Sequence, residues 1–199
     1  MGAGYVDAVV NATLIGTALG RFLQNFIEEC LCHEYLHIIG FSLGAQIMSY
    51  AAEYYGRGRL KRLTALDAAG PIFQIPSHSS LSRDDAVFVD VIHTDGGRLG
   101  YLNSMGTADF YPNLGSAPQP HCTPGTPMKC SHYMSVEYYA ESILNPKAFL
   151  ARSCSSRIMW IMNMCNNDDD VTYMGYYVET KAKGNYYLNT NINSPYGQN

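Results

Sequence analysis

The sequence predicts an α/β fold with a mostly parallel central sheet, flanking helices and a C-terminal antiparallel hairpin. Three observations predict it. Short apolar runs at residues 35–40, 60–67 and 86–92 are typical of buried strands, and helical patterns lie among them. Strands joined by helical crossovers form a parallel sheet. Residues 173–180 and 184–191 alternate like the two arms of a hairpin.

Each early element has its own signal. Residues 5–29 carry apolar side chains at helical spacing, which predicts an amphipathic helix packed on the sheet. Residues 43–55 return to helical spacing and stop at Gly56, a residue that often ends helices. The strand at 60–67 ends at Asp67, directly before the helix-breaking stretch "AAGP".

Length and composition indicate one soluble globular domain. The 199 residues contain no repeat or low-complexity linker, so we expect residues 1–199 to form a single domain. The net charge of -4 and the lack of a basic run exclude a nucleic-acid-binding footprint. Because Asn11, Arg21, Gln24 and Glu28 interrupt the longest apolar stretches, we expect no transmembrane segment.

Six cysteines, an even number, favour disulfide pairing in an oxidising compartment; they are residues 30, 32, 122, 130, 154 and 165. The first residues, "MGAGYVD", do not form a secretion signal. We therefore expect a secreted, extracellular protein whose leading segment is absent from this sequence.

The stretch "HIIGFSLGAQ" carries the strongest chemical signal, because it places Ser42 between Gly40 and Gly44 where a strand turns into a helix. In this context Gly-x-Ser-x-Gly is typical of a serine nucleophile, with glycines that let strand and helix approach each other. The backbone N–H of Leu43 would then face the forming oxyanion. The alternative is that Ser42 only caps the helix.

A nucleophilic serine requires a histidine base and a carboxylate that orients it. In this type of fold the chain order is serine, acid, histidine, which points to Asp67 at a strand end and to His132 in "KCSHYMS". Asp95 also follows a strand and is the rival acid. We expect structural roles for His37 and His93, and the remaining histidines lack a favourable context: His33, His78 and His121.

Several blocks of the sequence resemble the animal pancreatic-type lipases, which include the phospholipases A1. The blocks are "HIIGFSLGAQ", "LTALDAAGPIF", "VFVDVIHTDGG", "GTADFYPN", "QPHC", "CSHYMSVEYYAESI" and "MGYYV" with "GNYYLNT". The resemblance covers essentially the whole chain and implies an α/β-hydrolase fold and hydrolysis of lipid esters. It places the family's triad on Ser42, Asp67 and His132, and so supports Asp67 over Asp95.

The sequence departs from the family pattern at three positions near the motif. The family usually has histidines where this chain has Phe41 and Gln46, and proline where it has Ala68. The resemblance also implies that about the first third of the catalytic domain, with the loop giving the second oxyanion N–H, would precede this sequence. We expect residues 1–199 alone to aggregate, or to turn over more slowly than an N-terminally extended protein by about 10² to 10³.

We expect no cofactor and no metal. Some relatives bind calcium between the triad acid and the next strand, but here only Asp84 and Asp85 are acidic, and we interpret residues 166–171 as a solvated turn. The spacing of His121, Cys122, Cys130 and His132 does not suit structural zinc, and a Cys122–Cys130 disulfide fits it better. The family implies a second disulfide, Cys154–Cys165, and leaves Cys30 and Cys32 without an evident partner.

The substrate class follows from the short loop that this first disulfide would close. Its seven residues, "TPGTPMK", cannot form the long amphipathic lid of a triglyceride lipase. The short loop resembles the phospholipase A1 branch, so we expect release of a fatty acid from the first glycerol position of a phospholipid at a lipid–water interface. A neutral glyceride lipase and a non-enzymatic, yolk-type lipid-binding relative are the alternatives. We expect no C-terminal lipid-binding β-sandwich domain.

Overall fold

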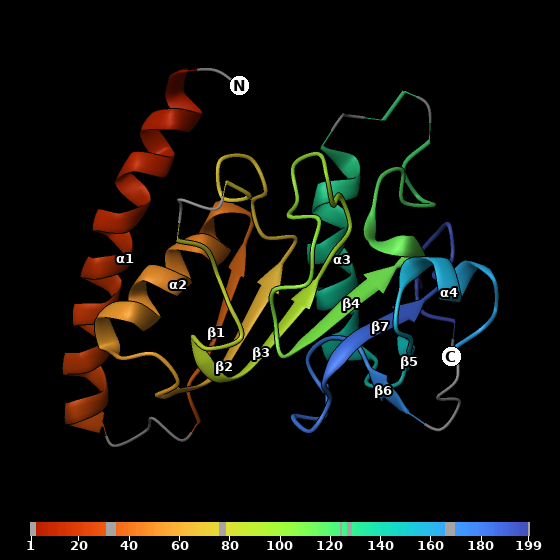
Figure 1. Ribbon diagram of the computed structural model, residues 1–199. Helices are drawn as coiled ribbons and strands as arrows, with labels where there is room; N and C mark the ends of the chain where they lie inside the picture. Colours follow the sequence, from red (N-terminus) through yellow and green to blue (C-terminus); the bar gives the residue numbers. More distant parts are fainter. Residues whose placement is uncertain are drawn as a thin grey trace.

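The computed structural model describes residues 3–30, 35–75, 79–123, 125–126, 129–165 and 170–198. A seven-stranded sheet runs through its centre in the order β1-β2-β3-β4-β7-β5-β6 (Figure 1). The strands are β1 (His37–Phe41), β2 (Leu60–Leu66), β3 (Ala86–Ile92), β4 (Ala108–Pro112), β5 (Leu150–Ser153), β6 (Val171–Tyr173) and β7 (Gly184–Leu188). The helices are α1 (Ala3–Cys30), α2 (Leu43–Tyr55), the 3₁₀ helix η2 (Asn113–Gly115), α3 (Cys130–Leu144) and α4 (Arg157–Ile161).

The sheet is mostly parallel, as the sequence predicts. β1, β2, β3, β4 and β7 pair in parallel, and β5 pairs antiparallel with both β7 and β6. The carboxyl ends of the parallel strands therefore meet at one edge, where the loops after β1, β2 and β3 come together (Figure 1).

Alternating side chains of the central strands divide the core between the two faces of the sheet. Val89 and Val91 of β3 join the apolar cluster under α1 and α2, whereas Phe88 and Ile92 join the cluster under α3. Since successive residues of a strand point to opposite faces, one run of apolar residues supplies both cores. This explains why β3 reads as a continuous apolar run in the sequence.

Two glycines bring α1 close to α2. A Cβ atom at Gly16 would lie 2.4 Å from the Cβ of Tyr50, and one at Gly20 would lie 2.7 Å from the carbonyl oxygen of Ala51. No larger side chain fits at either position without a shift of α2. The helical stretch expected at residues 5–29 is confirmed, and its main packing partner is α2.

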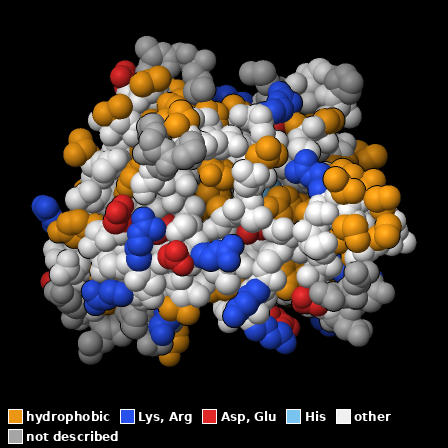
Figure 2. All heavy atoms as spheres, in the orientation of Figure 1, with side chains coloured by type: hydrophobic (Ala, Val, Ile, Leu, Met, Phe, Trp, Pro, Cys, Tyr) orange, Lys and Arg blue, Asp and Glu red, His pale blue; other side chains and the backbone are white. Residues whose placement is uncertain are grey.

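One helix, α1, is long and apolar enough to be a candidate membrane span, and the expectation of no transmembrane segment stays a prediction. Residues Gly4–Ile27 satisfy both conditions, because Asp7 and Arg21 are their only charged residues, and 28% of this stretch is buried. Apolar side chains line its outer side (Figure 2), among them Val10, Leu14 and Phe22. Length and composition alone do not distinguish a membrane span from a helix of a globular domain.

The expected C-terminal hairpin is also wrong. β6 and β7 do not pair with each other, because β5 lies between them. Tyr173 ends β6, and residues 174–180 form no strand but turns, a bend and irregular backbone; the Arg62 guanidinium holds this segment by donating to the carbonyls of Gly175 (2.8 Å) and Tyr176 (2.7 Å). These long-range contacts outweigh the strand preference of the tyrosines.

Arg62 also compensates a buried carboxylate, which leads to a stability prediction. Its Nε lies 2.8 Å from Oδ1 of Asp90, whose side chain is fully buried. Burial raises the pKa of Asp90, and the hydrogen bond and charge of Arg62 oppose that shift. Removing one partner of a buried ion pair leaves an uncompensated charge, so we expect Arg62→Met to lower the free energy of unfolding by about 3–5 kcal/mol.

Urea denaturation followed by circular dichroism measures this effect. Arg83→Met is the matched control, since Arg83 is exposed on the loop before β3. We expect the control to change the unfolding free energy by less than about 0.5 kcal/mol. Similar losses in both variants would show that the ion pair contributes no specific stability.

Candidate active site

Ser42 lies in a sharp turn between β1 and α2. Its backbone has φ 55° and ψ -119°, a conformation that non-glycine residues rarely adopt. The turn is held from both sides, because the Ser42 N–H donates to Leu66 (3.0 Å) and its carbonyl accepts from the N–H of Ala69 (3.1 Å). A strained backbone held by its neighbours is a feature of functional sites.

Only one of the two flanking glycines serves close packing. A Cβ at Gly40 would lie 2.7 Å from the backbone of Gly44 and Ala45, so the start of α2 requires glycine there. A Cβ at Gly44 would meet no atom within 4 Å. The expectation that both glycines prevent a clash is therefore wrong for Gly44 among the described residues.

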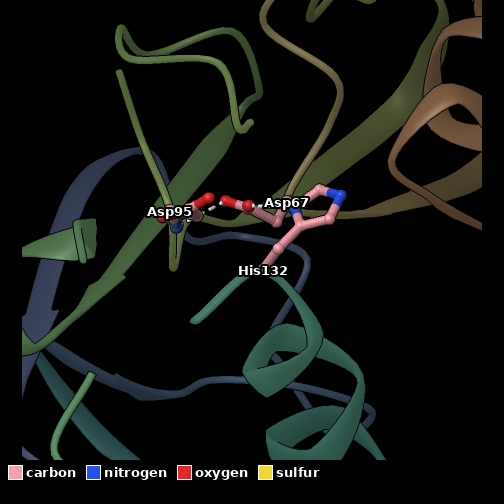
Figure 3. Close-up of side chains that lie close together, drawn as sticks. All are labelled: Asp67, Asp95 and His132. Carbon is pink, nitrogen blue, oxygen red and sulfur yellow. Dashed lines mark hydrogen bonds and ion pairs between the residues drawn. The ribbon is translucent and has the colours of Figure 1, made fainter. Parts of the chain in front are cut away.

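Asp67 follows β2 and is fully buried. The N–H groups of Thr94 and Asp95 donate to its Oδ1 at 2.8 and 3.0 Å. Its other oxygen, Oδ2, lies 2.6 Å from Nδ1 of His132 (Figure 3). The two amides orient the carboxylate, and the carboxylate in turn orients the imidazole.

His132 lies in the first turn of α3, and its ring packs against the ring of Phe41 with centroids 4.6 Å apart. A cavity of about 220 Å³ opens beside it, and both Ser42 and His132 line this cavity. The other lining residues are mainly apolar or aromatic, with one lysine: Tyr5, Phe41, Ala69, Pro71, Leu99, Lys129 and Tyr133. The structure thus brings Ser42 and the Asp67–His132 pair to one apolar cavity.

Leu43 is the first residue of α2, so its N–H has no acceptor within the helix. This N–H lies beside Ser42 at the positive end of the helix dipole, a place that suits the binding of an oxyanion. Tyr5, Lys129 and Tyr133 also line the cavity and were not predicted from the sequence. Lys129 and Tyr133 flank His132 at the start of α3, within the stretch "KCSHYMS", whereas Tyr5 reaches the cavity from α1. No motif or spacing relates Tyr5 to the other two.

The rival acid, Asp95, lies beside Asp67 (Figure 3). It accepts a hydrogen bond from the N–H of Leu99 (3.2 Å), and its Oδ1 has no hydrogen-bond partner among the described residues. Burial raises the pKa of Asp95, and the negative Asp67 adds to this rise, while the Leu99 N–H, Arg98 and His132 oppose it. The carboxylate that holds His132 in this structure is Asp67.

Among the described residues, Asp67, Asp95 and His132 form the one group of three acidic or histidine side chains whose ligand atoms all lie within 4.8 Å of one another. The Asp67 oxygens are already engaged in hydrogen bonds, because they accept the Nδ1–H of His132 and two backbone N–H groups. This arrangement does not suit a metal site. Near the calcium segment, the Asp85 carboxylate pairs with Arg57 at 2.8 Å.

Gly100 packs against the Asp67 carboxylate, which gives a second prediction. A Cβ at Gly100 would lie 2.4 Å from Oδ1 of Asp67. We expect Gly100→Ala to displace this carboxylate and to lower esterase turnover by about 10²-fold, the effect of a displacement near 1 Å. Gly97→Ala is the control: this glycine lies in the same loop, and a Cβ there would make an ordinary 3.5 Å contact with Leu102.

Rates on a small soluble ester measure both variants. Because Gly97 has φ 84°, its replacement by alanine adds backbone strain without a contact to Asp67. Thermal melting measures the stability that this strain costs. We expect Gly97→Ala to keep turnover within a few-fold at temperatures where it stays folded. Equal rate losses would assign the effect to loop strain rather than to the carboxylate.

The other described histidines have partners of their own. His37 begins β1 and lies 2.7 Å from Oγ1 of Thr64, and burial with the nearby Arg62 lowers its pKa to about 4. His93 contacts Asp109, and His121 contacts the carbonyl of Ile192. His33, His78, Cys32 and most of residues 166–171 lie outside the described residues, as does the side chain of Cys30.

Gln46, one of the departures from the family pattern, is buried and holds the loop after Asp67. Its Nε2 donates to the carbonyl of Ala69 (2.8 Å), and its Oε1 accepts from the N–H of Leu81 (2.9 Å). Ala68 is fully buried, and Phe41 packs on His132. All three departures therefore surround the candidate triad without replacing a member of it.

Two disulfides lie in different parts of the fold. Cys122–Cys130 closes the seven-residue loop directly before the turn that carries His132, and Cys154–Cys165 packs beside Tyr111, Tyr187 and Trp160. These are the two pairs expected from spacing and from the family. The first restricts where α3 begins, and so restricts His132.

The sequence of this chain is similar to known lipases. The model of the lipase family matches residues 2–196. Lipase member H of Xenopus tropicalis is 37% identical over 159 residues, covering 76% of this chain and 34% of the relative. Pancreatic lipase-related protein 2 of Bos taurus is 37% identical over 176 residues, covering 76% and 37%.

Hepatic triacylglycerol lipase of Oryctolagus cuniculus is 35% identical over 222 residues, covering 96% of this chain and 44% of that protein. The chain thus spans 34% to 44% of the lengths of these three relatives. The family match covers nearly the whole sequence, and the fold has the mostly parallel sheet expected from it. The chain therefore belongs to the pancreatic-type lipase family.

Proposed function

We propose that this protein is a secreted serine hydrolase of lipid esters, and specifically a phospholipase A1. The observation that carries the proposal is the 2.6 Å contact between Asp67 and His132 beside the cavity that Ser42 also lines. A serine, an imidazole and a carboxylate in this relation form the machinery of acyl transfer. The apolar lining of the cavity suits an acyl chain.

Each residue has a defined step in the proposed reaction. The Ser42 oxygen attacks the ester carbonyl carbon while Nε2 of His132 takes the serine proton. The carbonyl oxygen becomes an oxyanion that the Leu43 N–H stabilises, and Asp67 holds the imidazolium through Nδ1. His132 then protonates the departing alcohol, which leaves an acyl-enzyme. His132 then deprotonates a water molecule as it attacks the acyl carbon. The Ser42 oxygen leaves and takes that proton back from His132, which releases the fatty acid and restores the free serine.

The short loop between Cys122 and Cys130 supports a phospholipid as substrate. It encloses seven residues, and a loop of this length and composition does not form a long helical lid. Lys129, at the end of this loop, lines the cavity and supplies a positive charge for a phosphate. Two disulfides support secretion, because disulfides persist mainly in oxidising compartments.

A neutral glyceride lipase is the second candidate. It is favoured by the similarity to a protein named hepatic triacylglycerol lipase, which aligns with 96% of this chain. Phospholipid vesicles and triglyceride emulsions, compared at equal interfacial area, separate the two candidates. Faster hydrolysis of the emulsion would replace the phospholipase proposal.

Two measurements test the proposal directly. A fluorophosphonate probe should label the protein at Ser42, and phosphatidylcholine carrying distinct acyl chains should lose the chain at the first glycerol position. Release only from the second position contradicts phospholipase A1. No Ser42-dependent labelling at all would favour the non-enzymatic lipid-binding alternative.

A further inference from the structure

A second histidine–carboxylate pair lies behind the candidate triad, and the proposed mechanism does not use it. His93 is fully buried at the end of β3, and its Nε2 lies 2.8 Å from Oδ1 of Asp109. Its other nitrogen, Nδ1, lies 3.1 Å from the carbonyl oxygen of Tyr101. His93 is not among the residues that line the cavity beside Ser42.

Both ring nitrogens of His93 therefore face oxygen atoms. A carbonyl can only accept, so Nδ1 carries a hydrogen. Asp109 accepts the N–H groups of Met105 and Gly106 at 3.0 Å each, one on either oxygen, which favours its ionised form. An ionised carboxylate also only accepts, so Nε2 carries a hydrogen as well, and the ring is an imidazolium.

The ring of Tyr111 provides a third contact. It stacks on His93 with centroids 4.6 Å apart and an angle of 4° between the planes. The face of an aromatic ring attracts a cation. A charged His93 is therefore compensated by Asp109 in the plane of its ring and by Tyr111 on one face.

Two short routes connect His93 to the triad carboxylate. The residues that follow it, Thr94 and Asp95, donate their N–H groups to Oδ1 of Asp67. The carbonyl that His93 binds belongs to Tyr101, whose N–H donates to the carbonyl of Ala68 at 2.7 Å. His93 thus fixes the loops on both sides of Asp67.

We propose that His93 is a positioning residue that, as an imidazolium paired with Asp109, fixes the orientation of the Asp67 carboxylate and through it that of His132. This inference rests on the proposed hydrolase function. His93 touches neither the cavity nor the reacting atoms. It sets the geometry of the residues that do.

The test uses His93→Gln, with His121→Gln as the matched control, since His121 is exposed and, among the described residues, contacts the carbonyl of Ile192 and the ring of Tyr196 in the C-terminal segment. On p-nitrophenyl butyrate we expect His93→Gln to lower kcat about 10²-fold with little change in KM, the effect expected when a catalytic group is displaced by about 1 Å. The low-field proton resonance of His132 Nδ1–H should shift or disappear. The control should leave both unchanged.

A second measurement does not depend on the folding of a variant. Nitrogen-15 NMR of the unmutated protein at pH 7 should show both nitrogens of His93 protonated. One unprotonated nitrogen, or a His93→Gln variant that keeps both kcat and the His132 resonance, overturns the inference. Fluorophosphonate labelling of the unmutated protein at Ser42 tests the hydrolase function separately.

Discussion

Replacing Ser42 with alanine is expected to abolish ester hydrolysis, with a loss of about 10⁶-fold in turnover, the typical effect of removing the nucleophile from a triad. His132 and Asp67 remain in contact in this variant, but no oxygen is left to form the acyl-enzyme. Fluorophosphonate labelling and the rate on p-nitrophenyl butyrate measure the loss. The fold should survive, because the Ser42 side chain makes no capping hydrogen bond to α2 and the turn is held by the Ser42 backbone.

Ser79→Ala provides the matched control, since Ser79 is exposed and its backbone carbonyl, which accepts a hydrogen bond from Tyr50, is retained. We expect this variant to keep the full rate and full labelling. Alanine at position 42 also relieves no backbone strain, because the positive φ remains. Residual labelling in Ser42→Ala would assign the nucleophile to another residue.

Asp67→Asn should lower turnover about 10⁴-fold while leaving substrate binding nearly unchanged. The carboxylate accepts the Nδ1–H of His132 at 2.6 Å and thereby leaves Nε2 free to take the serine proton. A side-chain amide can donate to Nδ1 and would stabilise the tautomer in which Nε2 already carries a proton. The pre-steady-state acylation rate on p-nitrophenyl butyrate isolates this step.

Asp95→Asn is the informative comparison, because Asp95 lies in the same cluster and does not hold His132 in this structure. Its expected effect is much smaller, since the backbone N–H of Asp95, which binds Asp67, is retained. A larger loss for Asp95→Asn than for Asp67→Asn would make Asp95 the functional acid.

Local patterns predict the part of the fold around the nucleophile. The apolar runs that become β2 and β3, the helix from Leu43 to Tyr55 and its end at Gly56 follow from signals within a few residues. The first strand begins two residues later than the sequence predicts, since His37 is the first residue to pair with β2. The candidate triad also follows from chain order and motif context.

The contacts that complete the site are not local and could not be predicted. Gly100 lies against Asp67 because a loop after β3 folds back, and Tyr5 reaches the cavity from α1. The bonds of Gln46 to Ala69 and Leu81 likewise depend on how two loops meet. No period or spacing in the sequence predicts such contacts. For the same reason the sequence predicts a strand over residues 173–180, whereas the residues after Tyr173 form no strand and are held by Arg62.

The place of β7 in the sheet has a consequence for how the protein folds. This strand pairs with β4 on one side and with β5 on the other, although it follows both in the chain. The pairing of Gly184 with Ala108 closes a long loop between these two residues. Forming such distant pairings slows folding. During synthesis, β4 and β5 remain two unpaired edges until residue 188 has left the ribosome, so the emerging chain exposes strands prone to aggregation.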